Sequence, residues 1–162
     1  MNISFTPVTP EDMGFLKKVY RSTREEEMNL TDWDESQKTA FIDQQFQAQH
    51  DYYRQVYSGA TFSIIHLDGI PAGRLYIWES DSQIRIMDIA LLPGFRNKGA
   101  GTSILSDLIR TSEENNKILS IHVENYNPAL QLYLRLGFEK KDQTGVYYYL
   151  ERYPKKQDHP NS

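Results

Sequence analysis

The sequence predicts one α/β (α+β) domain in which helices flank a mixed sheet. The first observation is an apolar run at residues 84–92, as expected for a strand covered on both faces, followed by a basic glycine turn and an amphipathic helix. The second is that strand-like and helix-like segments follow one another without a repeat or a linker. The third is the length of 162 residues, which suits one core. We therefore expect a single domain over residues 1–153 and a polar, disordered tail over residues 154–162.

The first half of the chain opens with a strand and then shows two helix starts. Thr9 and Pro10 supply an N-cap and an N1 proline, and a second start at residues 31–35 opens a helix whose buried face is half polar. Asp68-Gly69 is a hairpin signal between two later strand-like runs. The elements expected here are a strand at 3–8, helices at 10–28 and 31–57, and strands at 61–67 and 72–78.

The second half is organised around the strand, turn and helix at residues 84–115. Asn127-Pro128 then starts a further helix, which Gly137 ends. Residues 142–145 are expected to turn the last hairpin. With strands at 118–123, 138–141 and 145–152, the predicted order is β-α-α-β-β-β-α-β-α-β-β.

Composition excludes several classes of protein. Zero cysteines exclude disulfides, thiolate metal sites and a cysteine nucleophile, and the histidines lack metal-ligand spacing, so no metal is expected. A formal charge of −4 argues against general nucleic-acid binding. No apolar run reaches the roughly 18 residues of a membrane span. Residues 1–13 also lack the features of a leader, so we expect a cytoplasmic protein with no membrane partner.

The turn at residues 96–101 has the features of a phosphate site. Its glycines let the backbone approach a ligand, and the helix that follows offers unpaired N–H groups at its positive end. A P-loop is excluded because Ala100-Gly101 stand where Lys and Ser/Thr are needed. A dinucleotide fingerprint is excluded because Ile104 takes the place of its third glycine. The remaining pattern is [RQ]-x-x-G-x-[GA] between a strand and a helix.

Together with a second block at residues 118–138, this pattern resembles the GCN5-related N-acetyltransferases (GNAT). That block contains an apolar strand, then Asn127, Ala129, Tyr133 and the ending Leu136-Gly137-Phe138. The resemblance implies a mostly antiparallel GNAT-like sheet and acetyl-CoA as the acyl donor. It further implies N-acetyl transfer to a primary amine of a small molecule or a peptide.

The donor is expected to lie along the end of the central strand and over the turn. The backbone N–H groups of the turn would hold the phosphates, and Thr102 lies near the helix start. By resemblance, the main chain at the strand end contacts the pantetheine arm, and the Leu91 N–H polarises the thioester carbonyl. Asn127 contacts the cofactor, or only caps its helix. The expected donor-binding residues are Ile89, Ala90, Leu91, Arg96, Asn97, Lys98, Gly99, Ala100, Gly101, Thr102, Asn127 and Tyr133.

Tyr133 is expected to be the general acid, because a phenol suits proton donation to a thiolate leaving group. The alternative is that its ring is one more core aromatic. Asp88 and Glu79 are the candidates for the general base, with Glu124 and His122 as further options. Asp88 interrupts an apolar strand, so it could equally pair with Arg74, Arg85 or a tyrosine.

The acceptor amine is not determined by the sequence. Acidic residues at 25–27 and 32–35 could attract a cationic amine, or could form a solvated helix face. Two other functions stay open: a non-catalytic module that binds coenzyme A as a sensor, and a nucleotide-binding domain. Whether the chain forms a homodimer is also left open.

Overall fold

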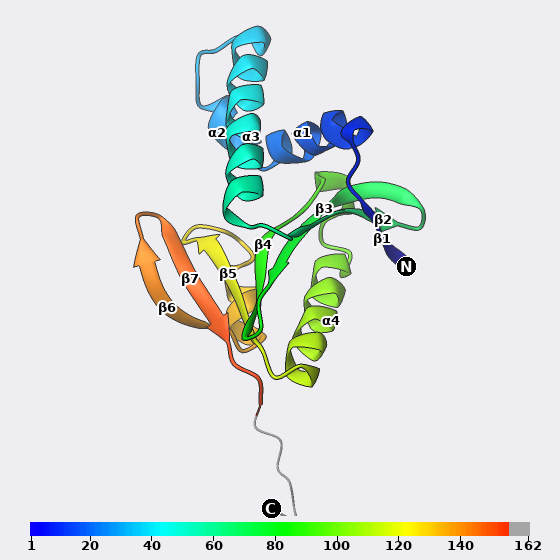
Figure 1. Cartoon of the computed structure of the whole chain (residues 1–162). Coiled ribbons are helices and arrows are strands. Elements are labelled where there is room, and N and C mark those ends of the chain that lie inside the picture. The colour runs from blue at the N-terminus through cyan, green and yellow to red at the C-terminus, as the bar shows by residue number, and fades with distance from the viewer. Residues whose placement is uncertain (156–162) are drawn as a thin grey trace, which may run out of the picture. The chain divides into compact units, whose positions relative to one another are not determined.

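The computed structural model describes residues 1–155 of the chain (Figure 1). Its elements are β1 (Ile3–Pro7), η1 (Pro10–Asp12), α1 (Met13–Ser22), α2 (Glu25–Asn29), α3 (Glu35–Val56), β2 (Thr61–Leu67), β3 (Ile70–Glu79), β4 (Gln83–Leu91), η2 (Pro93–Phe95), α4 (Ala100–Glu114), β5 (Ile118–Glu124), α5 (Leu130–Arg135), β6 (Glu139–Thr144) and β7 (Tyr147–Arg152). The disorder predicted for the tail falls mainly on residues 156–162, outside the described residues.

The strands form a seven-stranded sheet in the order β1-β2-β3-β4-β5-β7-β6. β1 pairs with β2, β5 with β7 and β6 with β7 in antiparallel fashion, whereas β4 and β5 are parallel. The predicted mixed, mostly antiparallel α/β architecture is therefore confirmed. Internal contacts group the chain into two compact units. Among the described residues, the N-terminal unit comprises residues 1–76 and 88–101, and the C-terminal unit comprises residues 77–87 and 102–155.

In the N-terminal unit, α1 packs beside α3 through buried apolar residues. Leu16, Val19 and Tyr20 of α1 are buried, as are Ile42 and Phe46 of α3. The rings of Tyr20 and Phe46 meet edge to face, with centroids 6.0 Å apart. This contact covers the apolar stripe of α1 and supplies the core of the helical part of the unit.

Both helix starts predicted in the first half agree with the structure, but the first helix ends earlier than predicted. The helix start at Thr9 was predicted correctly. The Thr9 N–H donates to Asp12 Oδ2 at 2.8 Å in a capping box. The prediction that this helix continues to residue 28 was wrong. The Thr23 hydroxyl donates to the Tyr20 carbonyl oxygen at 2.6 Å, which competes with the helical hydrogen bonds, and α2 is a separate short helix. α3 begins at Glu35 with Asp34 as its N-cap, within the start predicted at residues 31–35.

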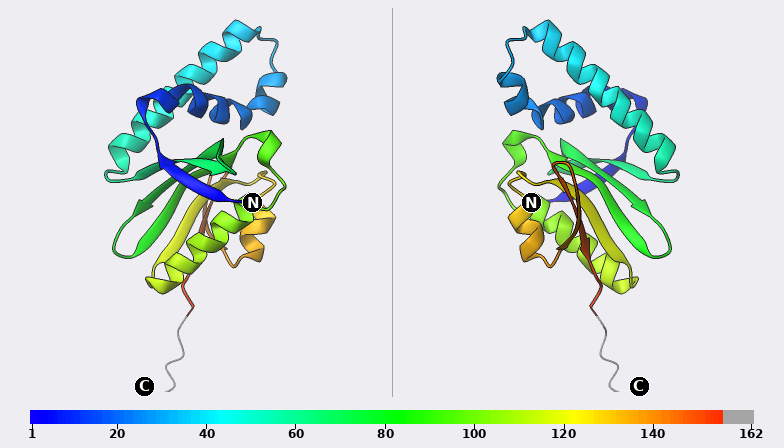
Figure 2. Two further views of the ribbon diagram at one scale, coloured as in Figure 1. Left: turned by 90° about the vertical axis from the view of Figure 1, so that its right-hand side faces the viewer. Right: turned by 90° about the vertical axis from the view of Figure 1, so that its left-hand side faces the viewer.

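In the C-terminal unit, α4 and α5 cover one face of the strands (Figure 2). Alternate residues of β5 and β7, such as Leu119, Ile121 and Leu150, are buried on that face. Arg152 of β7 links this face to the ends of both helices. Its side chain donates to Glu113 Oε1 at 3.0 Å and to the Leu136 carbonyl oxygen at 2.8 Å. The opposite face of these strands carries polar and aromatic side chains.

Two predicted boundaries in this unit were wrong. The helix expected from Asn127 begins at Leu130 and has six residues. The last hairpin turns at residues 145–146 rather than 142–145, because β6 continues to Thr144, opposite Tyr147. Gly145 has a φ of 59°, which suits this tight turn better than the residues before it.

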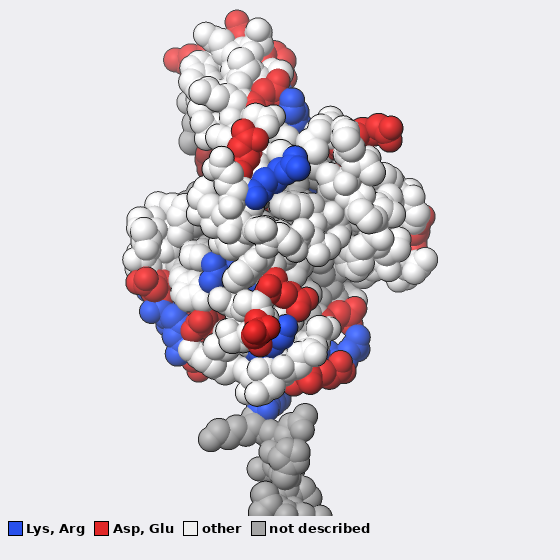
Figure 3. Space-filling view, in the orientation of Figure 1, with Lys and Arg blue, Asp and Glu red and all other residues white. Residues whose placement is uncertain are grey.

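No helix among residues 1–155 is both long and apolar enough to cross a membrane. On the face shown in Figure 3, acidic and basic side chains of the described residues are interspersed rather than gathered into one basic patch.

Candidate active site

The end of β4 is more open than its apolar sequence suggests. The ladder between β4 and β5 runs from Gln83 to Ile86, whereas β4 itself continues to Leu91. Ile89, Ala90 and Leu91 are half-buried, so the prediction that the whole run is covered on both faces was wrong at this end. A half-exposed strand end offers main-chain N–H and C=O groups to an extended ligand.

Gly73 of β3 lies close to the main chain of Ala90 and Leu91 at the end of β4. A Cβ at position 73 would overlap the Ala90 carbonyl oxygen and lie 3.0 Å from the Leu91 Cα. The Leu92 N–H also donates to the Ala72 carbonyl oxygen at 2.8 Å. Gly73 was not singled out from the sequence, although a glycine inside a strand is a signal of close backbone approach.

The turn after β4 leads directly into α4, a helix of 15 residues that begins at Ala100. Asn97 and Gly99 have φ values of 60° and 87°, in the left-handed region. A Cβ at Gly99 or Gly101 would meet nothing within 4 Å, so both glycines border open space. The unpaired N–H groups of the first turn of α4, where Thr102 is exposed, therefore lie beside room for a phosphate group.

Arg96 joins this turn to the end of β4. Its Nε donates to the Leu91 carbonyl oxygen at 2.8 Å, and Nη2 lies 3.5 Å from Ser22 Oγ. Arg96 and Lys98 are both exposed residues of the turn. Arg96 thus has a structural contact of its own, in addition to the charge that it brings to the turn.

Asp88 forms an ion pair with Arg74, one of the partners considered for it from the sequence. Arg74 is only 2% exposed and also donates from Nη2 to Gln49 Oε1 at 2.9 Å. Its guanidinium lies 4.8 Å from the centroid of the Tyr76 ring. Burial, followed by the nearby Asp88 charge, raises the pKa of Tyr53 above its ordinary value, so this phenol stays protonated.

Glu79 lies at the other end of β4 from Leu91. It precedes the turn in which the Ser80 N–H donates to the Gln83 carbonyl oxygen at 2.9 Å. Its Oε2 accepts from Lys117 Nζ at 3.3 Å. Residues 83–88 of β4 therefore stand in the chain between this carboxylate and the half-exposed strand end.

In the C-terminal unit, the second block brings Tyr133, Asn127 and Glu124 together around a short helix. Tyr133 is 5% exposed, and its ring meets Phe138 edge to face at 5.5 Å. Asn127 Oδ1 accepts from the Ala129 N–H at 2.8 Å, and Nδ2 donates to Glu124 Oε2 at 3.0 Å. The capping alternative for Asn127 thus has a structural basis.

These features occur within a known family of sequences. The model of the acetyltransferase (GNAT) family matches residues 23–138. The chain belongs to the GNAT family. The match includes the strand end, the turn and Tyr133. No curated protein sequence matches the chain significantly.

Solved structures share the fold with this GNAT chain at low sequence identity. PaiA N-acetyltransferase from Thermoplasma acidophilum, in complex with coenzyme A, has 17% identity and a TM-score of 0.68 over 94% of this chain and 99% of its own. An acetyltransferase from Thermus thermophilus has 16% identity and a TM-score of 0.66 over 94% and 97%. A GNAT family acetyltransferase from Elizabethkingia anophelis with acetyl-CoA bound has 17% identity and a TM-score of 0.59 over 94% and 98%.

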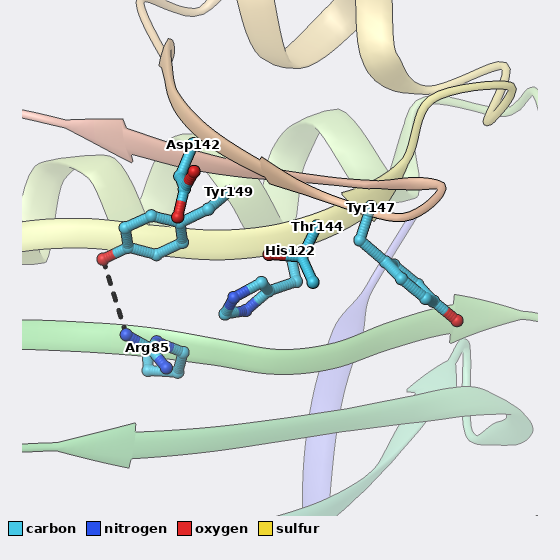
Figure 4. Close-up of a pocket in the computed structure, with 6 residues that line it drawn as sticks. All are labelled: Arg85, His122, Asp142, Thr144, Tyr147 and Tyr149. Carbon is cyan, nitrogen blue, oxygen red and sulfur yellow. Dashed lines mark hydrogen bonds between the residues drawn. The ribbon is translucent and has the colours of Figure 1, made fainter.

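This GNAT chain also has a pocket that was not predicted from its sequence. It has a volume of about 320 Å³ and lies wholly in the C-terminal unit (Figure 4). Its lining residues come from β4, β5, β6 and β7: Arg85, His122, Asp142, Thr144, Tyr147 and Tyr149. The available signal was the alternation of polar and aromatic residues with apolar ones along these strands.

His122 lies against Tyr149 in this pocket, with ring centroids 4.9 Å apart. Burial, and secondarily the Arg85 charge, lowers the pKa of His122, so the imidazole is neutral near pH 7. No group of three or more His, Asp or Glu side chains within the described part of the chain is arranged to hold a metal ion.

Proposed function

We propose that this chain transfers an acetyl group from acetyl-CoA directly to a primary amine. The observation that carries the proposal is the half-exposed end of β4, followed by an open glycine turn at the start of α4, in a member of the GNAT family. The coenzyme A and acetyl-CoA bound to structural neighbours support the same donor.

The donor phosphates would be held by the backbone N–H groups of residues 96–101 and by the first turn of α4. Peptide N–H groups at a helix start favour anions because of their geometry and the helix dipole. The main chain of Ile89, Ala90 and Leu91 would bind the amide groups of the pantetheine arm. This arrangement uses backbone atoms, so the apolar side chains of the strand are free to pack in the core.

The transfer itself needs a polarised carbonyl, a neutral amine and a proton for the leaving thiolate. We assign the first role to the Leu91 N–H, which would stabilise the oxyanion of the tetrahedral intermediate. The amine nitrogen attacks the thioester carbon, the C–S bond breaks, and Tyr133 Oη gives its proton to the sulfur. Zero cysteines in the chain exclude a thioester on the enzyme, which supports direct transfer.

The proton of the attacking amine would leave through water to a carboxylate. Asp88 is the candidate beside the strand end, and its ion pair with Arg74 holds it in one orientation. Glu124 is a second candidate, held by Asn127. Glu79 is less suited to this role, because it lies at the opposite end of β4 and is paired with Lys117.

Thermal unfolding with acetyl-CoA, ATP and NAD at equal concentration tests the donor. A ligand at 100 times its dissociation constant adds about 2.7 kcal/mol to the free energy of unfolding, which is a shift of several degrees for a chain of this size. A shift with acetyl-CoA alone is expected, followed by release of free thiol when primary amines are added. A shift with ATP or NAD alone would indicate a nucleotide-binding domain instead.

A coenzyme A sensor without catalysis is the second candidate function. It is favoured by the ion pairs of Asp88 and Glu79, which engage both carboxylates first considered as bases. Such a protein would bind acetyl-CoA, but would release no thiol with any amine.

A further inference from the structure

The outward face of the C-terminal unit differs from the face covered by α4 and α5. Along β5 and β7, apolar residues alternate with polar and aromatic ones, and the second set points away from the helices. The outward residues of β4, β5 and β7 are Gln83, Arg85, Ser120, His122, Tyr147, Tyr149 and Glu151. The cavity of about 320 Å³ lies on this face (Figure 4), and its volume suits a small molecule.

A β-bulge in β6 contributes two of the lining residues. Lys140 pairs with Leu150, but the next pair is Asp142 with Tyr149, so Lys141 is the extra residue. Without the bulge, Lys141 would stand opposite Tyr149, and Asp142 would turn to the other face. Bulges often re-aim side chains beside functional sites. Here the bulge brings Asp142 and Thr144 onto the outward face with Tyr149 and Tyr147.

Arg85 donates hydrogen bonds to three side chains beside the cavity. Its Nε donates to Ser120 Oγ at 2.9 Å, and Nη2 donates to Gln83 Oε1 at 3.3 Å and to Tyr149 Oη at 3.4 Å. Ser120 in turn donates to Gln83 Oε1 at 2.9 Å. Tyr149 Oη donates to Glu151 Oε2 at 2.8 Å, which fixes the ring that separates Arg85 from Asp142. A guanidinium fixed in this way loses little conformational entropy when it binds an anion.

The cavity therefore has opposite charges on either side of an aromatic floor. Arg85 meets the hydroxyl end of Tyr149, and Asp142 stands opposite the Tyr149 backbone in the β6–β7 ladder (Figure 4). The two charged side chains therefore lie toward different ends of the Tyr149 side chain. The rings of His122, Tyr147 and Tyr149 also line the cavity.

We propose that this cavity binds a small zwitterion whose carboxylate and ammonium are separated by a short chain, such as an ω-amino acid or a dipeptide. The carboxylate would accept hydrogen bonds from Arg85, because the guanidinium fork matches a carboxylate. The ammonium would donate to Asp142 and lie near the Tyr149 ring, whose face attracts cations. Binding in this cavity requires neither acetyl-CoA nor transfer of an acetyl group to the bound zwitterion. The site therefore goes beyond the acetyl transfer proposed above.

The test uses three compounds with the same five-carbon chain, followed by two-dimensional amide NMR of the whole protein. 5-Aminopentanoate carries both charges, pentanoate lacks the ammonium, and pentylamine lacks the carboxylate. We expect 5-aminopentanoate to shift the amide signals of His122, Asp142 and Tyr149 in a saturable way. Pentanoate and pentylamine, which each carry a single charge, should bind at least about tenfold more weakly than 5-aminopentanoate.

Two variants assign the charges. Asp142→Asn and Arg85→Gln should each weaken 5-aminopentanoate binding by about tenfold or more. Asp142 is on an exposed edge strand, so its variant tests the site even if Arg85→Gln disturbs the contact with Ser120. The matched controls are Asp107→Asn and Arg110→Gln, which change an exposed ion pair on α4 and should leave binding unchanged. Failure of 5-aminopentanoate to bind, equal binding of pentanoate, or unchanged affinity in both pocket variants would overturn the proposal.

Discussion

Arg74 and Asp88 form an ion pair in which the arginine is almost fully buried and a quarter of the aspartate side chain is exposed. The pair joins β3 to β4 at the point where β4 leaves its ladder with β5. Arg74 also binds Gln49, so the same contact reaches α3. The interruption of an apolar strand by Asp88 is thereby explained by a structural partner, and the proposed catalytic role of Asp88 is additional to it.

Arg74→Met should lower the free energy of unfolding by about 3 kcal/mol, because it leaves the Asp88 charge without its buried partner. The double variant Arg74→Met with Asp88→Asn should be less unstable than the sum of the single variants. Urea denaturation measures both. Arg110→Met, which removes an exposed ion pair with Asp107, is the control and should cost about 0.5 kcal/mol or less. Equal losses for Arg74→Met and Arg110→Met would show that the buried pair is not a stabilising contact.

Gly73→Ala should disturb the main chain at Ala90 and Leu91. The new methyl group overlaps the Ala90 carbonyl oxygen, which belongs to backbone and cannot rotate away. We expect a loss of about 1–3 kcal/mol in stability, together with weaker acetyl-CoA binding. Gly94→Ala is the control, because its Cβ meets nothing within 4 Å. Calorimetric titration with acetyl-CoA measures the affinity, and an unchanged affinity in Gly73→Ala would argue against a donor site at the strand end.

Gly101→Ala should move stability and donor affinity in opposite directions. Alanine is favoured over glycine in a helix by up to about 1 kcal/mol, and the methyl group at position 101 would enter open space. If that space receives the donor phosphates, acetyl-CoA binding weakens. Gly14→Ala in α1 has equally open surroundings and is the matched control. It should raise stability without any change in acetyl-CoA affinity. Identical acetyl-CoA affinities for the two variants would remove the turn from the donor site.

Tyr133→Phe should lower kcat by about 10²–10⁴-fold and leave acetyl-CoA affinity nearly unchanged, because general acid catalysis has this magnitude. Steady-state thiol release measures kcat, and calorimetry measures the affinity. The ring packing against Phe138 is kept, so the variant should fold normally. An unaltered kcat would mean that another group donates the proton to the leaving thiolate. If neither the original protein nor Tyr133→Phe released thiol, the coenzyme A sensor would be favoured.

Acidification should destabilise the protein through two histidines. Burial is the main cause that lowers the pKa of both His50 and His122 in the folded chain. The unfolded chain therefore binds more protons between the lowered pKa and the ordinary value of about 6.5, and stability falls as pH decreases through that window. His122→Gln should flatten this loss, as measured by thermal unfolding at several pH values. An unchanged slope would mean that His122 has its ordinary pKa in the folded protein.

Short-range patterns predicted the parts of the candidate site that depend on neighbouring residues. The turn after β4 and the start of α4 were predicted because glycine conformation and the helix start are encoded within a few residues. The end of the first helix was missed, because the hydroxyls of Ser22 and Thr23 bind their own backbone, and a periodic pattern does not show that competition. The half-exposed end of β4 was also missed, since a run of apolar residues does not report where a neighbouring strand stops pairing.

The sequence by itself determined the fold class, the glycine turn and the family, because these follow from local conformation and from the order of apolar segments. Only the tertiary structure decided that Arg74 pairs with Asp88, that Gly73 faces the Ala90 carbonyl, and that a bulge turns Asp142 toward Tyr149. Each of these depends on the register between neighbouring strands. Register is fixed by the packing of whole faces, and a shift of one residue reverses every side chain.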